Sequence, residues 1–176
     1  MSSTDINLKW FVIYTKPRSE KKLLSVLQDL KVEAYLPLLR HRKKWSDRFK
    51  WVEEPIFPSY IFVNIDFQNE SLRLRKLAQV VDFVRVAGQP VTISQQDITM
   101  LQYSLEKFND SLTVVDSSSF QVGEKVTITD GPFVGREAIV QQSKNRAKVM
   151  VSFPALLKIL LVEIPVEQIS KQAYQA

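Results

Sequence analysis

The stretch from Pro55 to Ile65 constrains the fold most, because it predicts a short strand with apolar side chains on both faces. Side chains alternate along an extended backbone, so the strand divides into two sets. One set, Ile61, Val63 and Ile65, is entirely β-branched and belongs in a core. The other set carries two aromatic rings, from Tyr60 and Phe62. Both faces of this strand therefore have to be covered by other elements of the domain or by a partner.

Two prolines fix where this strand begins. Pro55 and Pro58 lack backbone donors, so the hydrogen-bonded ladder is expected to start near Ser59. The aromatic side then needs either a covering helix or a binding partner. An ordinary core on both sides is the alternative.

The composition excludes several classes of chemistry. There is no cysteine, so disulfides, thiolate metal sites and cysteine nucleophiles are absent from the sequence. The single histidine, His41, lies in a basic run, which removes most triad and zinc arrangements. We therefore expect no catalytic residues, no bound metal and no cofactor. The 24 Lys and Arg against 19 Asp and Glu mildly favour anionic partners.

No segment of the sequence indicates a membrane. Residues 1–5 lack the basic-then-apolar pattern of a signal peptide, and the apolar run near Leu156–Val162 is split by Lys158 and too short to span a bilayer. We expect a soluble cytoplasmic monomer.

The N-terminal residues predict a strand followed by a helix. Residues 10–15 are aromatic and β-branched, and Ser19 is a candidate cap for a helix whose apolar stripe is Leu23, Leu27 and Leu30. Basic residues gather where the two elements meet, at Lys16, Arg18, Lys21 and Lys22. A helix N-terminus favours anions, so this junction is a candidate phosphate contact, and a solvated basic face is the alternative.

A second basic cluster follows a strand predicted at residues 32–39. Between Arg40 and Trp51, cations are interleaved with Trp45, Phe49 and Trp51. This pattern suits nucleic acid, through neutralised phosphates and stacked bases. The alternative is an exposed hairpin tip with Trp45 and Trp51 packed across its arms. The two interpretations are compatible.

The rest of the N-terminal half predicts a mixed fold. We expect a short helix at residues 71–77, a strand at 80–86, a turn at 88–90 and a helix reaching Phe108 that starts at a capping box formed by Ser94 and Asp97. The order of elements predicts one α+β sandwich over residues 8–108, an antiparallel sheet with flanking helices. Residues 109–119 are polar and are expected to be a linker.

From residue 120 onward the pattern changes to short strands, near residues 138–141, 147–153 and 159–164. An Asp-Gly-Pro turn begins at Asp130, where glycines permit positive φ and a proline fixes the backbone between them. Residues 120–171 are therefore expected to form a small SH3-like β-barrel.

Four segments together resemble the NusG family of transcription elongation and antitermination factors. They are Trp10–Tyr14, the Phe-Pro-Ser-Tyr strand at 57–63, Phe83–Arg85, which is similar to RfaH-like members, and a segment similar to the KOW motif of the C-terminal barrel. The residues of the KOW segment are Gly123, Asp130, Gly131, Pro132, Phe133 and Gly135. The KOW motif alone is shared with ribosomal proteins, whereas the ordered combination is specific to the family.

This resemblance implies a non-enzymatic protein whose N-terminal NGN domain binds the clamp helices of RNA polymerase and reduces pausing or termination. It places an apolar polymerase-contact patch at Phe57, Tyr60, Phe62 and Phe83. DNA near the transcription bubble would be contacted by the basic residues Lys16, Arg18, Lys22, Arg42, Lys43 and Lys44. The ribosome or another factor would be the partner of the KOW domain.

Several positions depart from the family pattern. Ser59 and Ala138 replace glycines, Pro17 replaces a basic residue, and the segment 71–73 lacks the His-Thr-Thr by which RfaH contacts the polymerase. These departures predict a specialised paralogue that acts on selected long operons, with a genome-wide housekeeping factor as the alternative. An RNA-binding or ribosome-associated KOW protein is a second alternative, but it leaves the aromatic patch unexplained.

RfaH folds its barrel segment into a helical hairpin, which raises the question of the same switch in this chain. Pro154 and Pro165 would confine any helix between them to about ten residues, which is marginal without strong packing. The β-branched residues of this segment favour strands. We expect a barrel in the free protein and an uncovered aromatic patch.

Overall fold

The computed structural model describes residues 7–108, 113–116, 124–129, 134, 137–143, 146–153, 158–165 and 169–171. The chain divides into two compact units, Met1–Ile98 and Thr99–Ala176. The division falls within helix α3 (Gln95–Phe108), the element that joins them in sequence. Each unit is described by itself.

The first unit is built on an antiparallel sheet around strand β1 (Lys9–Thr15). Strand β5 (Tyr60–Ile65) pairs with one side of β1, and the short strands β6 (Val80–Phe83) and β9 (Thr92–Ile93) pair with the other. Strand β2 (Glu33–Tyr35) extends the sheet beyond β5. The strand predicted from the two prolines is therefore a central strand that begins at Tyr60.

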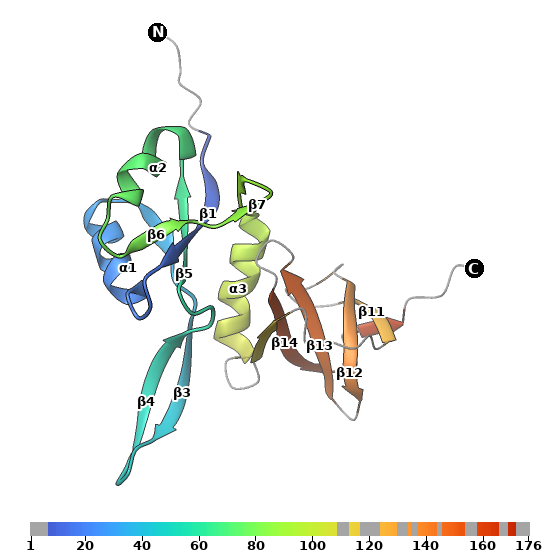
Figure 1. Cartoon of the computed structure of the whole chain (residues 1–176). Helices are drawn as coiled ribbons and strands as arrows, with labels where there is room; N and C mark the ends of the chain where they lie inside the picture. The colour runs from blue at the N-terminus through green and yellow to red at the C-terminus, as the bar shows by residue number, and fades with distance from the viewer. Residues whose placement is uncertain are drawn as a thin grey trace. The chain divides into compact units, whose positions relative to one another are not determined.

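The β-branched face of this sheet forms the main core, as predicted. Ile61 and Ile65 are fully buried, and helices α1 (Glu20–Asp29) and α2 (Phe67–Arg75) contribute Leu23, Leu27 and Leu74 to the same cluster. Figure 1 shows α1 and α2 beside the sheet. Burying one such aliphatic side chain contributes roughly 1.5–3 kcal/mol, so this face supplies much of the stability of the unit.

Helices α1 and α2 differ in part from the sequence prediction, and α3 begins as predicted. Ser19 occupies the cap position of α1, but its side chain makes no capping hydrogen bond, and Leu30, which is 37 % exposed, lies outside the buried cluster that holds Leu23 and Leu27. Helix α2 begins four residues before the predicted Ser71, because the Asp66 carboxylate accepts hydrogen bonds from the next turn. The predicted cap of α3 is confirmed, since Ser94 Oγ accepts from the Asp97 amide at 3.0 Å.

Two predicted strands are interrupted. The one expected at residues 32–39 breaks at Pro37, and strand β3 (Leu38–Lys44) then pairs with β4 (Phe49–Pro55) in a hairpin that projects from the sheet (Figure 1). The one expected at 80–86 ends at Phe83. Strands β7 (Arg85–Val86) and β8 (Gln89–Pro90) form a separate small hairpin, turned by the positive φ angles of Ala87 and Gly88.

The aromatic face of the sheet is covered, contrary to the open patch that the sequence predicted. Phe62 is fully buried and Phe57 is 1 % exposed, with the two rings packed edge to face at 6.1 Å. Tyr35 stacks on Phe62 from β2. On the same face, the Trp10 indole donates to Gln95 Oε1 at 2.7 Å, which fixes the first turn of α3 there.

The second unit contains a six-stranded antiparallel sheet in the order β10-β14-β13-β12-β11-β15. Its strands are β10 (Thr113–Asp116), β11 (Glu124–Ile128), β12 (Glu137–Ser143), β13 (Arg146–Phe153), β14 (Lys158–Pro165) and β15 (Ile169–Lys171). Four residues of the predicted linker 109–119 belong to this sheet, because β10 pairs with β14. Closure of the sheet into a barrel stays a prediction.

The C-terminal segment that RfaH folds into a helical hairpin is expected to form strands in this chain, and most of its described residues do. Residues 158–165, which could have continued an apolar helix, form β14 and pair along their length with β13. Residues 154–157 lie outside the described residues. Within the described part of the chain, no helix has both the length and the apolar character needed to cross a membrane.

Candidate nucleic-acid and partner interface

A tight turn ahead of β5 brings the beginning of α1 next to the central sheet. The Tyr60 amide donates to the Phe57 carbonyl at 3.1 Å, with Pro58 and Ser59 at the turn positions. Ser59 has φ +64°, a left-handed conformation that glycine adopts without strain. The Ser59 amide donates to Glu20 Oε1 at 2.7 Å, and Glu20 is almost fully buried. This charge-assisted bond joins the turn to the helix.

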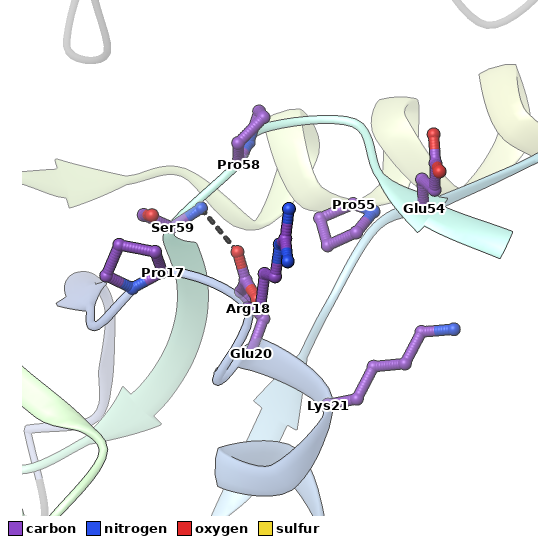
Figure 2. Close-up of a pocket in the computed structure, with 8 residues that line it drawn as sticks. All are labelled: Pro17, Arg18, Glu20, Lys21, Glu54, Pro55, Pro58 and Ser59. Carbon is purple, nitrogen blue, oxygen red and sulfur yellow. Dashed lines mark hydrogen bonds between the residues drawn. The ribbon is translucent and has the colours of Figure 1, made fainter.

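Around this turn lies an open pocket of about 450 Å³. Its lining is shown in Figure 2 and consists of Pro17, Arg18, Glu20, Lys21, Glu54, Pro55, Pro58 and Ser59. In that view the Arg18 side chain points between Ser59 and Pro55, and the dashed line is the bond from Ser59 to Glu20. The pocket therefore combines proline rings with cationic side chains at the junction of α1 and the β3–β4 hairpin.

One hydrogen bond ties the base of the hairpin to α1, and a second closes that base. Lys21 Nζ donates to the Glu53 carbonyl at 2.7 Å, and the Ile56 amide donates to the Pro37 carbonyl at 2.9 Å. The sequence groups Lys21 with the basic residues of the helix start, and the structure shows it holding the hairpin instead. The two basic clusters of the sequence are therefore neighbours in space.

The register of the hairpin separates its side chains into two faces. Residues paired directly across an antiparallel ladder lie on the same face. We call one the stacking face, and its members are Arg40, Arg42, Lys44, Phe49, Trp51 and Glu53. We call the other the ion-pair face, and its members are Leu39, His41, Lys43, Lys50, Val52 and Glu54.

Cations and rings contact one another on the stacking face. The Arg40 guanidinium lies 5.0 Å from the centre of the Trp51 ring, and that of Arg42 lies 4.8 Å from the centre of the Phe49 ring. Both distances are within the range of a cation–π attraction. The alternative interpretation packs Trp45 against Trp51 across the arms, but the register places Trp51 opposite Arg42, with Arg40 over its ring.

Charges compensate one another on the ion-pair face. Glu54 lies 3.0 Å from Lys43 Nζ and 3.4 Å from His41 Nε2. The hydrogen bond from Lys43 is the main reason that the pKa of Glu54 is lowered from its ordinary value, with the positive charges of Lys43, His41 and Lys21 adding to the effect. All of these groups are substantially exposed, so the pair stabilises the hairpin little.

The structure places the predicted nucleic-acid residues in two exposed groups. Lys16, Arg18 and Lys22 lie around the start of α1, and Arg42, Lys43 and Lys44 lie along β3. Lys43 differs from the other two hairpin residues because it faces Glu54. The six residues are accessible to an anionic partner, and their role stays a prediction.

The four predicted polymerase-contact residues do not form one surface. Phe57, Phe62 and Phe83 are at most 3 % exposed, and Phe83 lies on the opposite face, packed against Phe67 at 4.9 Å within the main core. The prediction of a shared patch is wrong because alternation shows which side chains share a face but not which face a helix covers. Tyr60 is the accessible member.

The sequence reasoning missed a neighbour of Tyr60. Tyr14 is directly opposite Tyr60 in the ladder, the rings meet edge to face at 5.9 Å, and Tyr14 is 43 % exposed. Its position in β1, on the side opposite Ile13, could have indicated this pair. The KOW residues Gly123, Asp130, Gly131, Pro132, Phe133 and Gly135 lie outside the described residues.

Comparison with known proteins gives consistent results. The family described as "Transcription termination factor nusG" matches residues 8–102. The transcription termination/antitermination protein NusG of Chlamydia pneumoniae is 31 % identical over 157 residues, covering 82 % of this chain and 85 % of that protein. The NusG of Rickettsia conorii is 26 % identical and covers 97 % and 94 %. A solved structure of Thermotoga maritima NusG has a TM-score of 0.61 at 22 % identity, covering 95 % and 98 %, and so shares the fold.

Proposed function

This chain belongs to the NusG family of transcription termination/antitermination factors, and on that premise we propose that it binds RNA polymerase through its first unit and reduces pausing or termination. The observation that carries the proposal is the match of residues 8–102, which spans the β1–β5 sheet and its helices. A surface for a large anionic complex is available on the same unit, because the basic groups of α1 and β3 are neighbours and exposed.

The polymerase contact we propose is the tyrosine pair, Tyr14 and Tyr60, at the open end of the aromatic face. Tyrosine is common at interface anchors because it combines a large apolar ring with a polar tip. Phe57 and Phe62 support this pair from the core instead of touching the partner. DNA near the polymerase would be met by the basic residues around α1 and β3.

Replacing the tyrosine pair tests the contact. The double variant Tyr14→Ala and Tyr60→Ala should weaken binding to purified core polymerase by roughly 1–3 kcal/mol, or about five- to 150-fold, while remaining folded. Phe83→Ala cannot serve this purpose, because loss of a buried ring costs about 3–5 kcal/mol of stability. Val86→Ala, at an exposed site on β7, is the matched control. Equal affinity of a folded tyrosine variant and wild type would exclude the pair as the contact.

We also propose that this is a specialised RfaH-like member acting on selected long operons. The support comes from the sequence, namely Ser59 and Ala138 at glycine positions of the family pattern and the different segment at 71–73. A housekeeping factor acting genome-wide is the alternative. Chromatin occupancy separates them, because a specialised member should be found on few transcription units and a housekeeping member on most.

A further inference from the structure

The two faces of the β3–β4 hairpin differ in what they offer to a ligand. The ion-pair face brings Lys43 and His41 onto Glu54, so part of its positive charge is neutralised within the protein. Both faces carry more cations than carboxylates, since Lys50 also lies on the ion-pair face, but the stacking face alone holds the two rings of strand β4, Phe49 and Trp51. A ligand that is both anionic and aromatic therefore has a reason to prefer the stacking face.

The rings of the stacking face remain accessible despite their cation–π contacts. Trp51 is 54 % exposed and Phe49 is 59 % exposed, although each has a guanidinium about 5 Å from its centre. More than half of each side chain is therefore exposed, which leaves ring surface for a further stack. The contacts also hold the rings and the guanidinium groups in place before any ligand arrives, which lowers the entropic cost of binding.

The spacing of these rings matches a nucleic-acid strand. Residues two apart on an antiparallel strand are separated by about 6.8 Å, so Phe49 and Trp51 stand at this distance along β4. Phosphates along one strand of a duplex are about 3.4 Å apart along the axis. The ring spacing is therefore close to twice the rise of a stacked base.

We propose that the stacking face binds single-stranded nucleic acid, with bases stacked on Trp51 and Phe49 and phosphates contacted by Arg40, Arg42 and Lys44. A double helix buries the faces of its bases, so it can use the cations but not the rings. The proposed function determines where the protein would meet such a strand during transcription. The ability of the stacking face to bind single strands does not depend on that function.

Binding of short oligonucleotides to the full-length protein tests this inference. The probes are fluorescent 15-nucleotide oligo(dT) and oligo(rU) and a 15-base-pair duplex, titrated at one fixed salt concentration and followed by anisotropy. Wild type should bind at least one of the single strands more tightly than the duplex, and the tighter of the two identifies DNA or RNA as the ligand. Tighter binding to the duplex than to either single strand would overturn the proposal.

Matched variants separate stacking from charge. The double variant Phe49→Leu and Trp51→Leu should lose at least tenfold in single-strand affinity, because each base–ring stack contributes substantially to binding. Trp45→Leu removes a tryptophan of similar exposure outside the stacking face and should bind as wild type. Lys43→Gln, on the ion-pair face, should weaken single-strand binding less than Arg42→Gln. Equal loss in Trp45→Leu and Trp51→Leu would contradict the assignment.

A spectroscopic signal distinguishes stacking from a merely structural role of the ring. Oligo(dT) or oligo(rU) should quench the tryptophan emission of wild type and Trp45→Leu, but quench Trp51→Leu much less. Unchanged quenching in a folded Trp51→Leu protein would overturn the proposal. These titrations contain no polymerase, so a protein that fails in them can still affect elongation, and a protein that binds oligonucleotides can still leave elongation unchanged.

Discussion

At the scale of single residues, Ser59 joins the central strand to the start of α1. It has a left-handed backbone, yet its amide and carbonyl are both used, donating to Glu20 and accepting from the Thr15 amide at 2.8 Å. The backbone strain of a non-glycine residue in this region is of order 1 kcal/mol or more. The bonds on both sides of the residue hold it there.

Ser59→Gly should therefore stabilise the first unit. Glycine removes the strain, but it also makes the unfolded chain more flexible, which lowers the free energy of unfolding by about 0.4–1 kcal/mol. The expected net gain in the free energy of unfolding is therefore up to about 1 kcal/mol. Urea denaturation followed by circular dichroism measures it. Ser59→Val is the opposing control and should destabilise, since a β-branched residue is disfavoured at positive φ. A glycine variant clearly less stable than wild type would contradict the strain assigned to this turn.

The Glu54 carboxylate provides a pH-dependent test of the ion-pair face. Its pKa is lowered below 4.5, chiefly by the hydrogen bond from Lys43. A carboxylate with a lowered folded-state pKa contributes stability at pH above its unfolded value, and loses it as pH falls through the folded value. The pairing should thus persist at neutral pH and disappear under acid conditions below 4.5. Carboxyl NMR titration should show the Glu54 midpoint rising in Lys43→Gln; identical midpoints would contradict the pairing.

At the scale of secondary-structure elements, the sequence predicted the strands and helices better than their interruptions. Period-two spacing correctly gave β1 and β5, because burial of one face determines that pattern, and the capping-box motif correctly gave the start of α3. The break at Pro37 follows from a residue that has no amide to donate to a ladder, whereas the break after Phe83 depends on a tertiary hydrogen bond, from the Val84 amide to the Val12 carbonyl. Such contacts leave no local periodicity.

Because local patterns do not contain tertiary contacts, the burial of the aromatic residues in the candidate site was not predicted. Alternation identified the ring-bearing face of β5, but burial of Phe62 depends on Phe57, Tyr35 and the elements that follow, which a one-strand pattern does not contain. The basic residues could be predicted because charge keeps them at the surface. Their division into two hairpin faces required the register of β3 with β4.

The basic groups of α1 and the hairpin give a prediction for these elements acting together. Replacing Lys16, Lys22, Arg42 and Lys44 by Gln should reduce the salt dependence of binding to a DNA-bearing polymerase complex. Each lost phosphate contact lowers the slope of log affinity against log salt by about 0.7–0.9. Lys9→Gln and Lys76→Gln, at exposed sites outside both groups, are the matched control. A slope equal to that of wild type would mean that these charges are only solvated.

At the scale of the whole molecule, two units are joined through α3. The first carries most of the match to the family and, among the described residues, the tyrosine pair and both basic groups, and the second contributes a six-stranded antiparallel sheet. The pairing of β13 with β14 uses the segment that would otherwise be free to form a helix. We therefore predict that this segment gives strand-like NMR shifts over residues 158–165 in the intact chain; helical shifts there would contradict the structure.

We propose that this protein acts on the elongating polymerase. The most direct measurement is a single-round elongation assay with purified RNA polymerase on a long template containing defined pause and termination sites, with and without the full-length protein. At saturating concentrations of the protein we expect shorter pauses or greater read-through of terminators. The variant carrying both Tyr14→Ala and Tyr60→Ala should change pausing and read-through less. If the wild-type protein changes neither the pause lifetimes nor the read-through at any of these sites, the proposed action on the polymerase is wrong.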